Sequence, residues 1–134
     1  MSAPRILIVD DHVTNIELTR FVLEADGLLV DAVSNARQAL QHIHEVPPDL
    51  VLMDIQMPGI DGLDLTRRLK ADLATRSIVV VAFTAYAMKG DETRLRSAGC
   101  DGYLAKPINV ALFAHQVRAL LAAGAQPVAP GLPA

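Results

Sequence analysis

Five residues with charged or reactive side chains each follow a short apolar run of the sequence. They are Asp10, Asp11, Asp54, Thr84 and Lys106. A single polar residue in such a place is commonly a turn or helix-capping residue. Capping does not readily explain all five together. We therefore treat three carboxylates, one hydroxyl and one ammonium as a candidate reactive set.

The chemistry of this set points to phosphoryl transfer. Carboxylates crowded together repel one another, so a site that excludes water needs a cation or protons to offset the repulsion. Mg²⁺ suits Asp10, Asp11 and Asp54, because it prefers oxygen ligands and can bridge carboxylate and phosphoryl oxygens. Asp54 could then attack phosphorus as a nucleophile and form an acyl phosphate. Lys106 and the Thr84 hydroxyl would stabilise the charge on the transferred group.

The elements that must position these residues can be read from the apolar pattern. Five apolar runs predict strands at residues 6–9, 29–33, 50–53, 78–83 and 103–105. Continuous apolar character is typical of a parallel sheet covered on both faces. Stretches with helical spacing follow the runs, at about residues 16–23, 36–43, 63–73, 89–98 and 110–121, and glycines or prolines close most of them.

This alternation predicts an α/β fold. Five βα units joined by right-handed crossovers form a doubly wound, five-stranded parallel sheet, (βα)5, in the flavodoxin-like order 2-1-3-4-5. Ligands of such sheets bind beyond the carboxyl ends of the strands, at the point where the strand order switches. The five candidate residues all lie at these ends, so the predicted fold brings them together.

Composition limits the other possibilities. A chain of 134 residues with 51% hydrophobic content predicts one domain, over residues 1–123, with a disordered Ala/Gly/Pro-rich tail at 124–134. The net charge of −3 and scattered Lys and Arg residues do not favour direct nucleic-acid binding. No apolar run approaches the roughly 20 residues of a membrane span. We expect a soluble, cytoplasmic protein without membrane insertion. The single cysteine, Cys100, is best explained as a packing residue.

At the level of motifs, the sequence resembles the receiver domains of response regulators, the CheY-like superfamily. The resemblance covers about residues 5–122. It rests on Asp10-Asp11, the stretch Leu52-Met53-Asp54-Ile55-Gln56-Met57-Pro58-Gly59, Thr84-Ala85 and Lys106-Pro107. The stretch 84–92, with Gly99-Cys100, is most similar to DivK-type single-domain regulators and to receivers of hybrid sensor kinases.

The resemblance implies a single-domain response regulator of a two-component system. Asp54 would accept a phosphoryl group from a histidine kinase or a histidine phosphotransfer protein, and the chain would have no independent substrate. Asp11, Asp54 and the backbone carbonyl of Gln56 would bind Mg²⁺ directly, and Asp10 would reach it through water. The Lys106-Pro107 bond would be cis.

A switch between two states is also implied. Thr84 and Tyr103 would form the switch pair that alters binding of a downstream protein partner at the face of the fourth helix, fifth strand and fifth helix. Both residues also have simpler explanations, as a β-branched strand residue and a packed aromatic. Gln56 and Tyr86, two residues beyond Asp54 and Thr84, should tune the lifetime of the acyl phosphate, although Tyr86 could equally be a surface aromatic.

Other functions remain as alternatives. A phosphatase of the dehalogenase type also uses a strand-end aspartate, but it needs a second acid where this chain has Gln56. A flavodoxin-like electron carrier would need a phosphate-binding first loop, and here that loop is acidic. A pseudo-receiver would be expected to lack one of the five groups. The four histidines form no metal-binding pattern, and His12 is interpreted as a loop residue.

Overall fold

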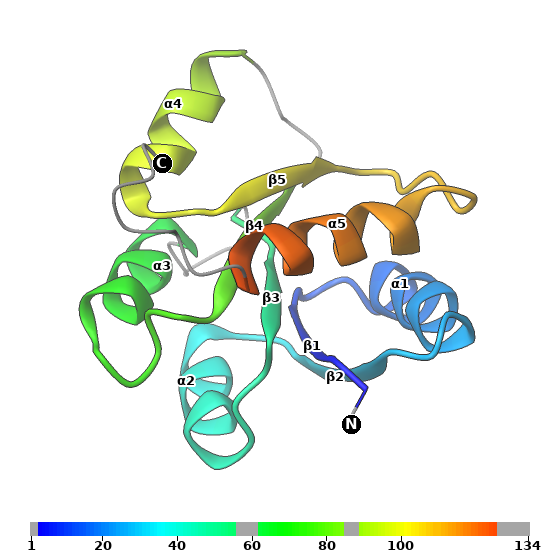
Figure 1. Ribbon diagram of the computed structural model, residues 1–134, viewed down its shortest axis with the longest axis horizontal. Coiled ribbons are helices and arrows are strands. Elements are labelled where there is room, and N and C mark those ends of the chain that lie inside the picture. Colours follow the sequence, from blue (N-terminus) through cyan, green and yellow to red (C-terminus); the bar gives the residue numbers. More distant parts are fainter. Residues whose placement is uncertain (1–2, 56–61, 85–88, 126–134) are drawn as a thin grey trace.

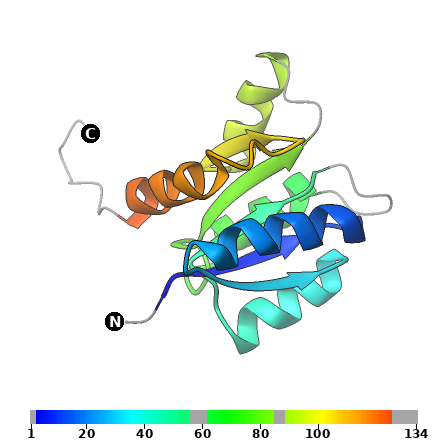
Figure 2. The ribbon, with the colours of Figure 1, turned by 90° about the vertical axis from the view of Figure 1, so that its right-hand side faces the viewer.

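The structure, a computed structural model, describes residues 3–55, 62–84 and 89–125. The strands are β1 (Arg5–Val9), β2 (Leu29–Val33), β3 (Leu50–Met53), β4 (Val79–Thr84) and β5 (Gly102–Ala105). All four pairings are parallel and the strand order is 2-1-3-4-5, which confirms the predicted sheet. The strand arrowheads accordingly lie toward the same end of the molecule (Figure 2).

Helices cover both faces of the sheet. They are α1 (Val13–Ala25), α2 (Ala36–Glu45), α3 (Gly62–Ala71), α4 (Lys89–Ala98) and α5 (Phe113–Ala125). Helices α1 and α5 lie on one face, and α2, α3 and α4 lie on the other (Figure 1). This is the doubly wound arrangement expected from the sequence.

The glycines predicted to end two helices do so. Gly27 after α1 has φ of 88° and Gly99 after α4 has φ of 105°, a left-handed conformation that favours glycine. The last helix differs from the prediction, since it begins at Phe113 rather than near Val110 and passes through Gly124 to Ala125. Asn109 explains the later start, because its side chain and carbonyl accept main-chain hydrogen bonds in a turn before the helix. The tail was predicted at residues 124–134; its first two residues belong to α5, and residues 126–134 lie outside the described residues.

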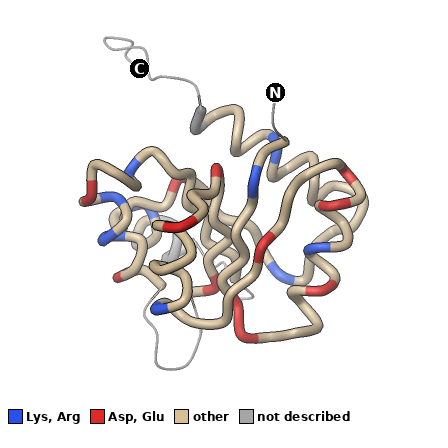
Figure 3. Tube along the Cα trace, turned by 90° about the horizontal axis from the view of Figure 1, so that it is seen from below, with Lys and Arg blue, Asp and Glu red and all other residues tan. Residues whose placement is uncertain are grey.

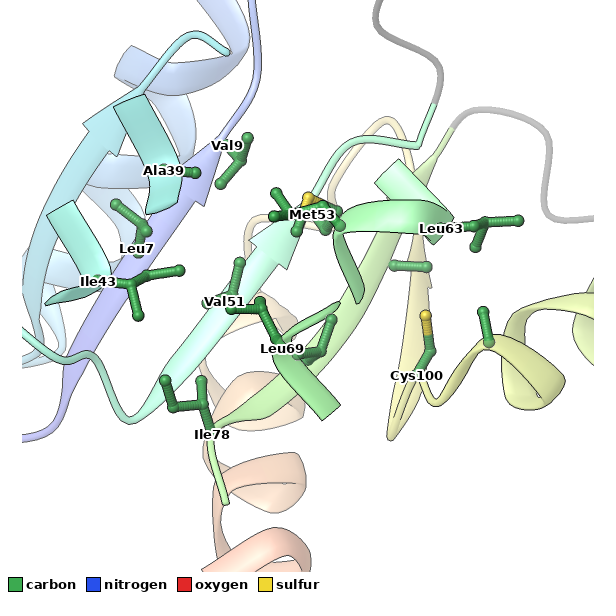
Figure 4. Close-up of a cluster of buried hydrophobic side chains, with 14 of the residues drawn as sticks. Leu7, Val9, Ala39, Ile43, Val51, Met53, Leu63, Leu69, Ile78 and Cys100 are labelled. Carbon is green, nitrogen blue, oxygen red and sulfur yellow. The ribbon is translucent and has the colours of Figure 1, made fainter. Parts of the chain in front are cut away.

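Strand alternation divides the core into two layers. Leu7 and Val9 point to the layer beneath α2 and α3, whereas Ile6 and Ile8 point to the layer beneath α1 and α5. Cys100 is buried in the first layer (Figure 4), which confirms its packing role, and burial raises the pKa of its thiol. A core on both faces explains why the strands lack polar–apolar alternation.

The surface charges are interspersed. Lys and Arg residues lie among Asp and Glu residues along the chain (Figure 3). Among the described helices, none combines the length and apolar character needed to cross a membrane.

Candidate functional site

Three of the predicted site residues are fixed by main-chain hydrogen bonds at the ends of strands. The N–H of Asp10 donates to a carbonyl of β2 at 3.1 Å, and the N–H of Asp54 donates to a carbonyl of β1 at 2.9 Å. The N–H of Lys106 donates to the last residue of β4 at 2.9 Å. Each bond extends the sheet by one residue past a strand end, so these backbones are positioned by the sheet itself.

Gly62 allows α3 to begin directly behind Asp54. A Cβ atom at this position would lie 2.9 Å from the Cα of Ile55 and 3.1 Å from the carbonyl oxygen of Asp54. Cβ atoms in proteins do not approach main-chain atoms so closely. The main chain cannot move aside to make room, as the end of a flexible side chain could. Glycine therefore permits the close helix–strand contact that supports the position of Asp54.

Lys106 connects two buried carboxylates. Its Nζ lies 2.8 Å from Asp10 Oδ2 and 3.2 Å from Asp54 Oδ2. The three side chains are 11%, 1% and 3% exposed, respectively. The ammonium also lies 5.1 Å from the centroid of the Phe83 ring, a favourable position for a cation. Charges buried to this degree require partners, and here a single cation serves two acids.

Asp10 is held in its charged form. Burial by itself would raise the pKa of Asp10, but hydrogen bonds from the Lys106 side chain and the His12 N–H outweigh burial and hold that pKa below its usual value. The two oxygens have different partners, since Oδ2 accepts from Lys106 and Oδ1 accepts from the His12 N–H at 2.9 Å. Asp10 is thus a buried carboxylate ready to stabilise positive charge.

His12 lies in the loop between β1 and α1, as interpreted from the sequence, and its ring lies beside this acidic group. Asp10, Asp11, His12 and Asp54 each offer a ligand atom, and these atoms all lie within 4.8 Å of one another. The spacing between histidines in the sequence did not predict the position of His12 beside the carboxylates. The informative feature was that His12 directly follows the acidic pair Asp10-Asp11.

The side chains fit a hard divalent cation such as Mg²⁺. Three carboxylates gather here and the Lys106 ammonium contacts two of them, so two negative charges remain in excess when these four groups are ionised. Carboxylate oxygens are the ligands that Mg²⁺ prefers. Asp10 and Asp54 are buried and Asp11 is partly exposed, so one side of the cluster remains accessible from solvent.

Thr84 and Tyr103 lie on the same face of the sheet. Tyr103 pairs with Ala82 in the β4–β5 register, and Thr84 lies two residues beyond Ala82 on the same strand. Alternation therefore directs both side chains to the face that α2, α3 and α4 cover. Thr84 is fully buried, and Tyr103 is 38% exposed. Their role as a switch pair stays a prediction.

The remaining predicted residues divide into two groups. The Lys106–Pro107 peptide bond is cis. Gln56 and Tyr86 lie outside the described residues, so the Gln56 carbonyl as a metal ligand and both side chains as lifetime-tuning residues stay predictions.

Comparisons with known proteins agree with this geometry. A family model described as the response regulator receiver domain matches residues 6–118. The polar-differentiation response regulator DivK of Brucella anthropi is 44% identical over 116 residues, which cover 87% of this chain and 94% of that protein. DivK of Brucella ovis is 43% identical over the same length.

Solved structures show the same fold. A putative response regulator from Chloroflexus aurantiacus superposes with a TM-score of 0.84 at 31% identity, over 90% of this chain and 99% of that one. The signal receiver domain of a histidine kinase from Syntrophus aciditrophicus has a TM-score of 0.81 at 32% identity, over 95% and 96% of the two chains. The match of motifs, fold and site shows that the chain belongs to the response regulator receiver domain family.

Proposed function

We propose that Asp54 is the phosphoacceptor of this receiver domain. Phosphorylation on an aspartate is general for the family, as is interaction with histidine kinases or phosphotransfer proteins and with downstream targets. The observation that carries the proposal is the position of Lys106, whose ammonium contacts both Asp54 and Asp10 at the buried end of the sheet. A cation in this place would stabilise phosphoryl oxygens on Asp54.

Asp54 suits the acceptor role better than its acidic neighbours do. Asp10 accepts hydrogen bonds from the His12 N–H and from Lys106, so it serves to hold that lysine beside Asp54. Asp11 is 35% exposed, which leaves it more hydrated. Asp54 follows β3, between the acidic pair after β1 and the lysine after β5. A phosphoryl group there would meet the Lys106 ammonium on one side and a divalent cation held by the acidic pair on the other.

The transfer itself exchanges one bond for another. A carboxylate oxygen of Asp54 attacks phosphorus, the P–N bond of a donor phosphohistidine breaks, and the imidazole leaves with its electron pair. Lys106 stabilises the charge on the phosphoryl oxygens as they move. Mg²⁺ held by Asp11 and Asp54 directly, by Asp10 through water and by the Gln56 carbonyl would supply further positive charge beside those oxygens.

The product is a modified form of this chain, so we propose a signalling module that acts on itself and has no independent substrate. Thr84 would move toward the new phosphoryl group, and Tyr103 would turn inward behind it. Their shared face supports this coupling. Helices α4 and α5 flank β5, so a change at Tyr103 would alter the α4-β5-α5 face that binds a downstream protein. Gln56 and Tyr86 would set how long the acyl phosphate lasts.

The proposal is tested by phosphorylating the Asp54→Asn variant. Acetyl phosphate with Mg²⁺ should give one phosphoryl adduct on the unaltered protein, detected by intact-mass spectrometry, and none when the metal is chelated. Asp54→Asn should give no adduct, because an amide oxygen cannot form a stable acyl phosphate. Asp31→Asn, which alters a carboxylate of β2 that is paired with Arg5, is the matched control and should be modified normally. An adduct on Asp54→Asn would contradict the assignment.

A further inference from the structure

The His12 imidazole lies among the acidic side chains of the site. Its Nδ1 is 3.0 Å from Asp11 Oδ1, 3.1 Å from Asp10 Oδ1 and 3.9 Å from Asp54 Oδ2. All three carboxylates therefore face the same ring nitrogen. Nothing in the mechanism of phosphoryl transfer requires an imidazole at this position.

The contact with Asp10 is a hydrogen bond, and the same distances also suit ligand atoms that share one metal ion. Adjacent ligands of an octahedral ion at about 2.1 Å lie about 3.0 Å apart, and opposite ligands lie about 4.2 Å apart. The distance from Nδ1 to Asp11, which would bind the ion directly, matches the spacing of adjacent ligands. The distance to Asp54 falls between the two spacings. Nδ1 can thus join the carboxylates around a single cation with little rearrangement.

The backbone holds His12 in this position. Its N–H donates to Asp10 Oδ1 at 2.9 Å, and its carbonyl accepts the first hydrogen bond of α1, from Ile16 at 3.0 Å. His12 is the N-cap residue of α1, yet its side chain makes no capping hydrogen bond. The ring is 62% exposed, so its contacts with the Asp10 and Asp11 carboxylates set its orientation, rather than helix capping or core packing.

We propose that His12 Nδ1 is a metal ligand that biases this site toward first-row transition-metal dications such as Mn²⁺ and Co²⁺. The inference rests on the proposed metal site at Asp10, Asp11 and Asp54. Mg²⁺ has a strong preference for oxygen ligands, whereas imidazole nitrogen favours transition metals, increasingly so from Mn²⁺ to Ni²⁺. A site with one nitrogen among its oxygens discriminates between these ions more than a site of carboxylates alone.

The test compares the binding of two metals to tag-free protein with His12 or with Asn at that position. Asn is a preferred N-cap residue, so His12→Asn should keep α1 and the fold intact, as a thermal melt will verify. Calorimetry should show that His12→Asn lowers the affinity for Co²⁺ about tenfold but changes that for Mg²⁺ less than about twofold. His115→Asn, which removes an exposed histidine of α5, should leave both affinities unchanged.

A spectroscopic measurement identifies the nitrogen directly. Pulsed electron paramagnetic resonance of the Mn²⁺-loaded protein should detect ¹⁴N coupling from a bound imidazole, and His12→Asn should abolish it. An unchanged ratio of Co²⁺ to Mg²⁺ affinity, or ¹⁴N coupling that persists in His12→Asn, would overturn the inference.

A third variant separates this inference from the proposed function. Asp11→Asn should weaken both Mg²⁺ and Co²⁺ binding, because it removes a carboxylate that both ions use. If Asp11→Asn weakens both ions while His12→Asn behaves like the unaltered protein, only the role of His12 is wrong. If Asp11→Asn binds Mg²⁺ normally, the metal site of the proposed function is wrong, and the inference about His12 is overturned with it.

Discussion

Two charge clusters in this protein are built in opposite ways. In the site cluster, Asp10, Asp54 and Lys106, one cation lies between two acids, and all three side chains are nearly buried. In the edge cluster, Arg5, Asp31 and His42, one acid lies between two basic side chains. Asp31 Oδ2 is 2.9 Å from Arg5 and 3.1 Å from His42, and these side chains are between a quarter and a third exposed.

The difference separates a functional cluster from a structural one. The site cluster carries excess negative charge away from water, an arrangement that is unfavourable by itself and that a further cation relieves. The edge cluster joins β1, β2 and α2, and nearby water screens its charges. Loss of one member should therefore have unequal consequences in the two places.

The largest effect is expected at Lys106. Lys106→Met leaves Asp10 and Asp54 buried without their shared cation, and breaking a buried pair in this way costs about 3 kcal/mol of unfolding free energy. Urea denaturation without divalent metal measures the loss. Mg²⁺ should restore part of the stability, because an ion that binds only the folded state stabilises it. Equal stability of the variant and the unaltered protein without metal would show that the site cluster is not under electrostatic strain.

A smaller effect is expected at Arg5. Arg5→Met removes one of two partners of Asp31, but water and His42 remain, so the unfolding free energy should fall by less than about 1 kcal/mol. The same urea experiment applies, and Mg²⁺ should not restore the loss because the edge cluster is not a metal site. If Arg5→Met lowered the unfolding free energy as much as Lys106→Met does, the proposed difference between the site cluster and the edge cluster would be wrong.

The smallest effect is a dependence on pH in the edge cluster. Burial would raise the pKa of Asp31, but hydrogen bonds from Arg5 and His42 hold it below its ordinary value of 3.8. A lowered folded pKa stabilises the protein fully above the ordinary value, and this contribution disappears as pH falls through the folded pKa. The stability difference between the unaltered protein and Asp31→Asn should thus shrink below about pH 4.

Carboxyl carbon chemical shifts measure the same quantity directly. In Arg5→Met, the titration midpoint of Asp31 should move upward toward the ordinary value, because the first of its two stabilising partners is lost. A midpoint that does not move would mean that Arg5 does not hold Asp31 in its charged form.

Much of this architecture follows from local sequence. The bounds of α4 agree with the prediction from apolar spacing and Gly99, since both features act within one element. The start of α5 could not be placed in this way. There the Asn109 side chain competes for main-chain N–H groups, and apolar spacing does not record that competition. The strand-end rule correctly grouped Asp10, Asp54 and Lys106, because carboxyl ends of parallel strands meet at one edge.

The sequence by itself determined which residues end the strands, because a strand buried on both faces is a continuous apolar run and its first polar residue marks where that run ends. Tertiary structure alone decided how those residues pair. Lys106 is 96 positions from Asp10 in the sequence and 52 positions from Asp54, yet its ammonium contacts both carboxylates. The contact is possible because β3 lies next to β1 and each aspartate is the first residue after its strand. The surroundings of His12 combine both levels. Its two nearer carboxylates, Asp10 and Asp11, directly precede it in the sequence, whereas the third, Asp54, lies beside it only because β3 pairs with β1.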